Sequence, residues 1–201
     1  SPLPLYVVNL ESQPERRRFM EAQLVALPEG FRIEWIRAVD GRALSEEEIR
    51  ADYDPAIALR TTGRPLNRGE IGCALSHRLI YRKMLEREEP FAVVLEDDVA
   101  LSERFPEAVF ALAQTVPLDR PRIFLLGDFF VPSIWKWRLG QTSFRYLRAW
   151  RGRFTIAYGL TLAAARALNE AQTPIRRAAD WWPDLERNGV IEAWGIQPPC
   201  A

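Results

Sequence analysis

Histidine, cysteine and lysine are all scarce in this sequence of 201 residues. It contains one histidine, His77, and two cysteines, Cys73 and Cys200, and two of its 27 basic residues are lysines. Two cysteines do not make the disulfide framework of a small secreted domain, so a reducing compartment is the simpler expectation. With no second histidine and no closely paired cysteines, the sequence does not predict a zinc site.

Long apolar runs and an excess of charge of either sign are also lacking. No run approaches the roughly 18 apolar residues of a membrane-spanning helix, and the N-terminus lacks the charged start of a signal peptide. The formal net charge is zero, which gives no overall attraction to nucleic acid or membrane. We therefore expect a cytoplasmic protein that is at most peripheral to the inner membrane.

What the sequence does contain is an alternation of apolar strand-like runs with helical patterns. The 48% hydrophobic and 27% charged content is typical of a globular chain, and its length suits a single domain over residues 1–201. Strands are predicted at 5–10, 31–39, 122–126, 154–158 and 190–194 and in the apolar run from 91. Helices are predicted at 14–27, 67–89, 103–116 and 161–171, with short ones after 45 and 180, whereas 52–66 looks irregular. This alternation predicts an α/β fold with a mainly parallel central sheet flanked by helices.

Three consecutive carboxylates, Glu96, Asp97 and Asp98, end the apolar run that starts at Phe91. Charge is expensive to bury, so the acids should lie where the strand leaves the sheet, which is also where α/β sheets bind ligands. Hard oxygen ligands favour Mg²⁺ or Mn²⁺, usually held together with substrate phosphates. The alternative is that one Asp caps the next helix and the other acids are solvated.

Several motifs along the first half of the chain resemble glycosyltransferase family 25. They are Tyr6-Val-Val-Asn-Leu10 with Glu15-Arg-Arg17, Ala38-Val-Asp-Gly41, Gly69-Glu-Ile-Gly-Cys-Ala-Leu-Ser-His77 and Leu95-Glu-Asp-Asp-Val99. This family comprises bacterial lipopolysaccharide glycosyltransferases related to collagen galactosyltransferase domains. The resemblance implies a type A glycosyltransferase fold, a UDP-sugar donor (commonly UDP-galactose), a Mn²⁺ or Mg²⁺ ion and inversion at the anomeric carbon. Residues 1–100 would then bind the nucleotide sugar and residues 101–201 the acceptor.

Within that family, the carboxylates acquire specific roles. Alternate side chains of a strand share a face, so Glu96 and Asp98 are expected to point together and bind the metal, while Asp97 reaches the sugar hydroxyls. An inverting transfer also needs a general base on the far side of the sugar from the diphosphate. Asp180 is the first candidate, although it would equally cap the following helix. Asp128 and Asp184 are the reserves.

The donor-binding candidates each have a structural alternative. The candidates are Asn9, Arg17, Asp40, Gly69, Glu70, Ser76 and His77. Arg17 would reach the diphosphate or else form a surface ion pair, and Asp40 would bind the base or ribose or else stabilise a turn. Glu70 is fully explained as half of a capping box. Ser76 and His77 would bind the donor or satisfy buried backbone groups.

Residues 129–169 combine basic and aromatic side chains and contain no Asp or Glu. Aromatic faces stack on sugars and arginines bind phosphates, so this region suits a phosphorylated glycolipid acceptor. Residues 129–153 would also suit contact with an anionic membrane, whereas nucleic acid is an unlikely partner. The alternative is a hairpin whose aromatics belong to the core and whose arginines are solvated.

The sequence therefore predicts a metal-dependent hexosyltransferase that acts on a saccharide acceptor of a bacterial surface glycolipid. A Mg²⁺-dependent phosphohydrolase is one alternative, but Asn9 stands where its nucleophilic Asp would be expected. A glycan-binding module with vestigial acids is the non-enzymatic alternative.

Overall fold

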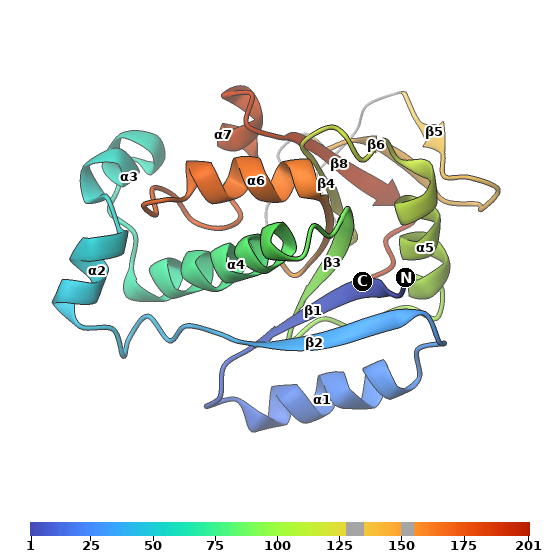
Figure 1. Cartoon of the computed structure of the whole chain (residues 1–201), viewed down its shortest axis with the longest axis horizontal. Helices are drawn as coiled ribbons and strands as arrows, with labels where there is room; N and C mark the ends of the chain where they lie inside the picture. Colours follow the sequence, from blue (N-terminus) through green and yellow to red (C-terminus); the bar gives the residue numbers. More distant parts are fainter. Residues whose placement is uncertain (128–134, 150–154) are drawn as a thin grey trace.

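A single eight-stranded sheet runs through the computed structural model, which describes residues 1–127, 135–149 and 155–201 (Figure 1). The strands are β1 (Leu3–Asn9), β2 (Phe31–Arg37), β3 (Phe91–Glu96), β4 (Arg122–Leu125), β5 (Trp137–Arg138), β6 (Arg145–Arg148), β7 (Ala157–Thr161) and β8 (Glu192–Gln197). Their order across the sheet is β2-β1-β3-β7-β4-β8-β6-β5. Six strands run in one direction and β6 and β7 in the other, so three of the seven strand pairings are parallel and four are antiparallel. The predicted α/β fold with a central sheet is confirmed, and the sheet is mixed.

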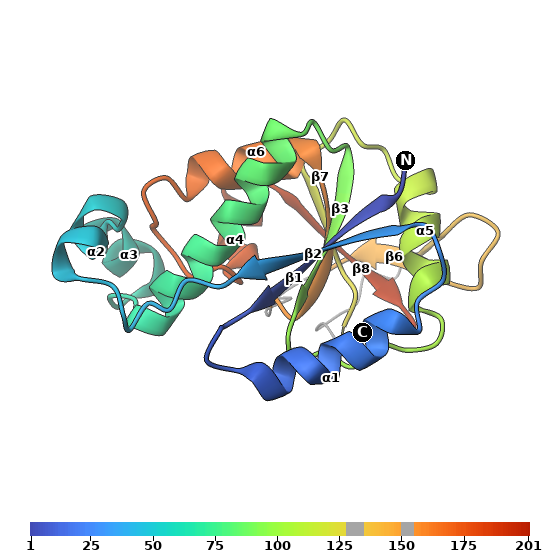
Figure 2. The same ribbon diagram turned by 60° about the horizontal axis from the view of Figure 1, so that its bottom comes forward.

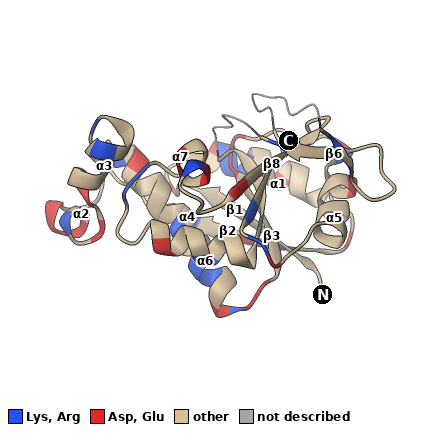
Figure 3. Ribbon diagram, turned by 90° about the horizontal axis from the view of Figure 1, so that it is seen from above, with Lys and Arg blue, Asp and Glu red and all other residues tan. Residues whose placement is uncertain are grey.

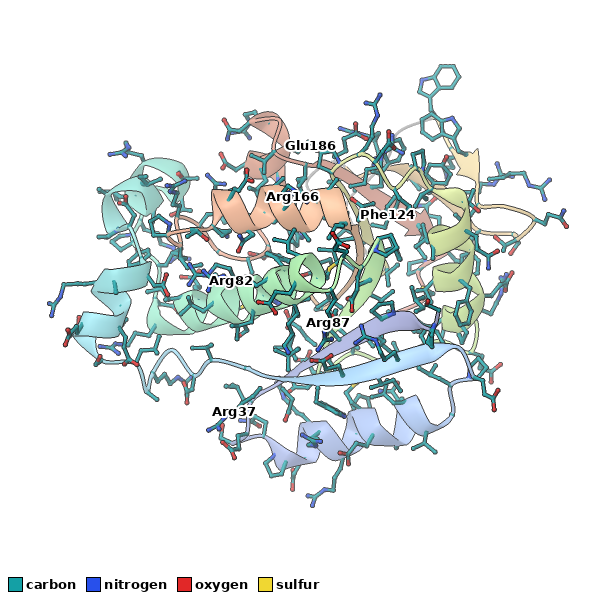
Figure 4. The ribbon with its side chains drawn as sticks, viewed as in Figure 1. Arg37, Arg82, Arg87, Phe124, Arg166 and Glu186 are labelled. Atoms are coloured by element: carbon teal, nitrogen blue, oxygen red, sulfur yellow. The ribbon has the colours of Figure 1, made fainter. Side chains whose placement is uncertain are left out.

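Helices cover both faces of this sheet (Figure 2). They are α1 (Pro14–Val25), α2 (Glu46–Asp52), α3 (Pro55–Thr62), α4 (Arg68–Glu86), α5 (Phe105–Thr115), α6 (Leu162–Ala171) and α7 (Trp182–Arg187). One core cluster packs α1 and α5 against the sheet and includes Phe124 of β4 (Figure 4). A second cluster packs α4, α6 and α7 against the opposite face. The two clusters make a three-layered α/β/α arrangement.

The fully buried β1 shows how the sequence specifies these layers. Leu5 and Val7 belong to the cluster beneath α1 and α5, whereas Tyr6 and Val8 belong to the cluster beneath α4. A strand covered on both faces needs apolar residues at every position, which is why its sequence shows no polar alternation.

α3 is the element that the sequence reading missed, because 52–66 was expected to be irregular. Asp54 caps this helix by accepting from the Ile57 N–H at 2.9 Å, Pro55 opens it, and Gly63 ends it with a φ of 78°. Pro and Gly were taken as loop signals, yet at these two positions they are helix-start and helix-end signals. A small third cluster packs α2 and α3 against the start of α4, away from the sheet.

The charges are dispersed over this framework. Figure 3 shows acidic and basic residues side by side on α2 and α7.

Within the described ranges, no helix combines the length and hydropathy needed to cross a membrane.

Candidate functional site

A cavity of about 350 Å³ opens at the carboxyl ends of β1, β2 and β3. Because these strands are parallel, the segments that follow them meet at one edge of the sheet, where the start of α4 closes the cavity. Six of the predicted site residues line it: Asp40, Gly69, Ser76, His77, Glu96 and Asp97. The cavity is therefore the place where the sequence-derived candidates converge.

Asp97 is the buried member of the carboxylate trio. Its Oδ2 accepts from the Asn9 side-chain amide at 2.7 Å, and its Oδ1 lies 3.2 Å from Arg16 Nη1. The same Asn9 amide nitrogen also donates to the Gln13 carbonyl at 3.2 Å. Asn9 thus ties β1 to β3 and to the start of α1, and it does not line the cavity.

Asp98 lies on the exposed side of the same guanidinium. Its Oδ2 is 3.0 Å from Arg16 Nη1, and its side chain is 44% exposed. Arg16 therefore supplies the positive charge that three adjacent carboxylates require, and both acids raise the pKa of Arg16. Sequence reasoning selected the neighbouring Arg17 and missed Arg16, for which the only signal was its place in the same Arg-rich first turn.

Glu96 has different partners from Asp97 and Asp98, and the strand alternation that predicted a shared face for Glu96 and Asp98 does not extend to Asp98. β3 ends at Glu96, and Asp97 and Asp98 lie in the following turn, where strand alternation no longer applies. Glu96 Oε1 accepts from the Thr155 hydroxyl and lies 3.7 Å from His77 Nε2. Burial alone would raise the Glu96 pKa, but His77, Thr155 and Arg16 together lower it, so the group is a carboxylate.

His77 is a buried residue of α4 that lines the cavity. Its Nδ1 lies 2.8 Å from the Tyr158 hydroxyl of β7, and that hydroxyl is 3.4 Å from the Tyr81 hydroxyl. Burial disfavours charge on His77, but its contacts with Cys73 and Glu96 outweigh this and raise its pKa.

Ser76 and the small residues of α4 bring the loop after β2 close to the helix. The Ser76 hydroxyl donates to the Gly72 carbonyl at 2.7 Å and accepts from the Val39 N–H at 2.8 Å. A Cβ on Gly72 would lie 2.5 Å from the Val39 carbonyl oxygen, so only glycine allows this approach. Gly72 therefore allows the helix to lie against the loop after β2, and Ser76 satisfies backbone groups, as its structural alternative proposed.

Asp40, Glu70 and Arg17 each make the contact that was given as the structural alternative to donor binding. Asp40 Oδ1 accepts from the Arg42 N–H at 3.0 Å, which stabilises the turn, although the residue remains exposed to the cavity. Glu70 completes the capping box with Asn67 and pairs with Arg64. Arg17 pairs with Glu21 at 2.8 Å and lies over the Trp35 ring, outside the cavity.

Asp180 lines a second, smaller cavity of about 270 Å³ that adjoins the first. Glu96 and Cys73 line both cavities, which brings Asp180 close to the carboxylate strand. The N-cap of α7 is Trp181 rather than Asp180. Of the reserve bases, Asp184 is ion-paired with Arg177 at 3.2 Å, and Asp128 lies outside the described residues.

The basic and aromatic segment forms the β5–β6 hairpin, with part of residues 129–153 lying outside the described ranges. Phe144 is buried as core, but Trp135 is 69% exposed. Trp137, Tyr146 and Trp194 contact one another with ring centroids 5.4–5.9 Å apart. Arg148 pairs with Glu186 and Glu192, so acids from outside the segment neutralise part of its charge.

Comparison with known proteins supports the sequence resemblance. The profile of glycosyltransferase family 25 (LPS biosynthesis protein) matches residues 3–128. A glycosyltransferase 25 family member of Aedes aegypti is 39% identical over 94% of this chain and 32% of its own length. Human procollagen galactosyltransferase 2 is 30% identical over 56% of the chain and 18% of its own length.

A further human relative is named as an inactive member of the family. The inactive glycosyltransferase 25 family member 3 is 31% identical over 86% of this chain and 29% of its own length. The chain thus spans at most about a third of the length of these relatives. The extent of the profile match and the order of the shared motifs lead to one conclusion: this chain belongs to glycosyltransferase family 25.

Proposed function

We propose that this chain is a glycosyltransferase that moves a hexose from a UDP-sugar to an acceptor hydroxyl, with inversion at the anomeric carbon. The observation that carries the proposal is the convergence of Glu96 and Asp97, the loop after β2 and the start of α4 on one cavity, with Asp98 held beside it by Arg16. A relative named procollagen galactosyltransferase favours galactose as the sugar.

The diphosphate of the donor would lie near Arg16 and Asp98. Arg16 lines the cavity and is half exposed, and its guanidinium can bind phosphate oxygens through two donors. Asp98 offers hard carboxylate oxygens, and Mg²⁺ or Mn²⁺ is commonly held by one or two such groups together with phosphates. We therefore propose Asp98 as the main ligand of such a cation, with Glu96, whose Oε1 already accepts from Thr155, as a second ligand acting partly through water. When bound, such an ion would offset the charge that develops on the leaving diphosphate.

The transfer itself needs a base opposite the diphosphate. The acceptor oxygen forms its bond to the anomeric carbon as the bond to the diphosphate oxygen breaks, and the acceptor proton passes to the base. We propose Asp180 for this role, because its cavity shares Glu96 and Cys73 with the donor cavity. Asp97, held by Asn9 and Arg16, would contact the sugar hydroxyls.

Two acceptor classes are consistent with the family. Its description names lipopolysaccharide biosynthesis, whereas the animal relatives include procollagen galactosyltransferases. The expectation of a bacterial glycolipid acceptor draws no support from those animal relatives. The exposed Trp135 and the Trp137–Tyr146 pair form a surface on which a sugar could stack. Contact of residues 129–153 with an anionic membrane is a separate expectation.

A non-catalytic role is the second candidate, because a relative named inactive matches 86% of the chain. Such a protein would bind a glycan without turnover. A donor screen separates the readings: the chain is incubated with UDP-galactose, UDP-glucose and UDP-N-acetylhexosamines, saccharide and peptide acceptors and Mn²⁺, and UDP release is measured.

We expect one UDP-hexose to be turned over, and Asp180→Asn to lower kcat by about 10²- to 10⁴-fold with donor affinity unchanged. Asp184→Asn serves as the matched control, because its carboxylate already pairs with Arg177. Absence of turnover with every donor would favour the binding module. Hydrolysis of a generic phosphomonoester would favour a phosphohydrolase instead.

A further inference from the structure

A thiol, an imidazole and a carboxylate converge on the wall between the two cavities. One ligand atom each from Cys73, His77 and Glu96 lies within 4.8 Å of the other two. Cys73 and His77 are one turn apart on α4 and therefore share a face, and Glu96 is the last residue of β3. The transferase proposal gives the Cys73 thiol no role.

His77 Nε2 is the observation that points to a ligand. This nitrogen is buried, has no hydrogen-bond partner among the described residues, and faces Glu96 Oε1 at 3.7 Å. A buried ring nitrogen left without a partner is costly, so its presence at this position needs an explanation.

The surroundings hold both side chains in orientations suited to metal binding. The Tyr158 hydroxyl, 2.8 Å from His77 Nδ1, fixes the orientation of the ring, and a cation bound at Nε2 would displace the proton that Nε2 otherwise holds beside Glu96. The Thr155 hydroxyl donates to Glu96 Oε1, the same oxygen that faces His77 Nε2, and so holds the carboxylate in place. Histidine and carboxylate ligands of metals are characteristically oriented by such outer hydrogen bonds.

We propose that Cys73, His77 and Glu96 form a binding site for a thiophilic divalent cation such as Zn²⁺. Thiolate, imidazole and carboxylate are the three ligand types that zinc accepts. In a tetrahedral zinc site, neighbouring ligand atoms lie roughly 3.5 Å apart, which the His77–Glu96 separation of 3.7 Å approaches. Three protein ligands leave the fourth position open.

The open position lies between the two cavities, because Cys73 and Glu96 line both of them. A water molecule or a ligand atom entering from either cavity would complete the coordination. The thiolate distinguishes this site from the oxygen-only site proposed at Asp98, since Mg²⁺ and Mn²⁺ prefer oxygen ligands. Cation binding here does not depend on transferase activity.

Cobalt titration of the metal-free, untagged chain under reducing conditions tests the proposal. We expect one Co²⁺ per chain with a cobalt–thiolate charge-transfer absorption band, displaced by Zn²⁺. Cys73→Ser should remove the band and weaken binding by at least about tenfold, and His77→Gln should weaken binding similarly. Cys200→Ser, which removes the other free cysteine, should change neither.

Three results would overturn the proposal. They are the absence of a thiolate band in the wild-type chain, its persistence in Cys73→Ser, and its loss in Asp98→Ala, where we expect it to be retained. Because His77 is buried, circular dichroism must show that His77→Gln is folded. Cys73 is only partly buried, so Cys73→Ser keeps the test decisive if His77→Gln does not fold.

Discussion

Asp97 and Asp98 are adjacent in the chain, yet their side chains meet very different surroundings. Asp97 is buried and bonded to Asn9 and Arg16, whereas Asp98 is largely solvent-facing beside the same Arg16. Asp97 therefore stabilises the fold in addition to any contact that it makes with the sugar. Asp98 remains available to a ligand.

This difference predicts opposite effects on stability. Asp97→Ala should lower the free energy of unfolding by about 1–3 kcal/mol, because it removes the buried acceptor of the Asn9 amide and leaves that amide with only its longer bond to the Gln13 carbonyl and Arg16 with only Asp98. Asp98→Ala should change it by less than about 0.5 kcal/mol, as is usual for exposed positions. Urea denaturation of the two variants provides the comparison, and equal losses would contradict this account.

The sequence identified the carboxylates but not their partners. Strand alternation was the reason to expect a shared face for Glu96 and Asp98, but the strand ends at Glu96 and the alternation does not reach Asp98. Cys73 was set aside because no second histidine or paired cysteine accompanies it. The sequence shows that Cys73 and His77 are one helical turn apart. Glu96 and Thr155 come close to them only because distant segments of the chain fold together.

At the scale of elements, the contact between α4 and the loop after β2 shapes the cavity. Gly72→Ala should destabilise the chain by about 1–3 kcal/mol and weaken nucleotide binding, because the new Cβ would overlap the Val39 carbonyl.

Gly69→Ala is the matched control on the same helix. Its Cβ would lie 3.2 Å from the Asn67 side-chain oxygen, a contact that a side chain relieves more easily than backbone does. Thermal unfolding of both variants tests the contact, whereas UDP binding of Gly72→Ala is compared with wild type because Gly69 itself lines the donor cavity. A Gly72→Ala variant as stable as Gly69→Ala, with the UDP affinity of wild type, would contradict it.

The other end of α4 is tied to β2 by charge. Glu34 of β2 pairs with Arg87 and with Lys83, whose Nζ lies 2.9 Å away (Figure 4 labels Arg87). Hydrogen bonds from Arg87 above all, aided by Lys83, lower the pKa of Glu34 to about 2. A depressed carboxylate pKa stabilises the folded state above the unfolded pKa, and this stabilisation is lost as the pH falls toward the folded value.

Glu34→Gln should therefore lower the stability by about 1 kcal/mol at pH 7, after allowance for solvent screening. The difference from wild type should shrink as the pH falls from about 4.5 toward 2. Melting temperatures measured across this range check the prediction, with Glu15→Gln as a control, because Glu15 is exposed and only distantly paired with Arg18. A difference that does not change with pH would rule out the ion-pair explanation.

Most elements were readable from local sequence, whereas their arrangement was not. The capping box that includes Glu70 was predicted and is present with Asn67, because it depends only on residues three apart, and Ser45 forms the same motif with Glu48. β7 was expected at 154–158 but runs over Ala157–Thr161, with Thr161 capping α6. The insertion of β7 between β3 and β4 is a long-range pairing that no local pattern encodes.

At the scale of the whole molecule, the two halves of the chain share one sheet. β3 from the first half pairs with β7 from the second, and the cavity containing Asp180 draws residues from both. A donor half and an acceptor half are therefore not separate folding units, and a change at their junction should affect both cavities.

In the proposed function, the carboxylates at the end of β3 and after it hold a metal-bound nucleotide diphosphate. Calorimetric titration of the chain with UDP, in Mn²⁺ and then in EDTA, measures this binding, with Asp98→Ala and Glu15→Gln alongside. We expect UDP binding that weakens at least about tenfold in EDTA and equally in Asp98→Ala, but not in Glu15→Gln. UDP binding of unchanged affinity in EDTA and in Asp98→Ala, or no UDP binding at all, would contradict it.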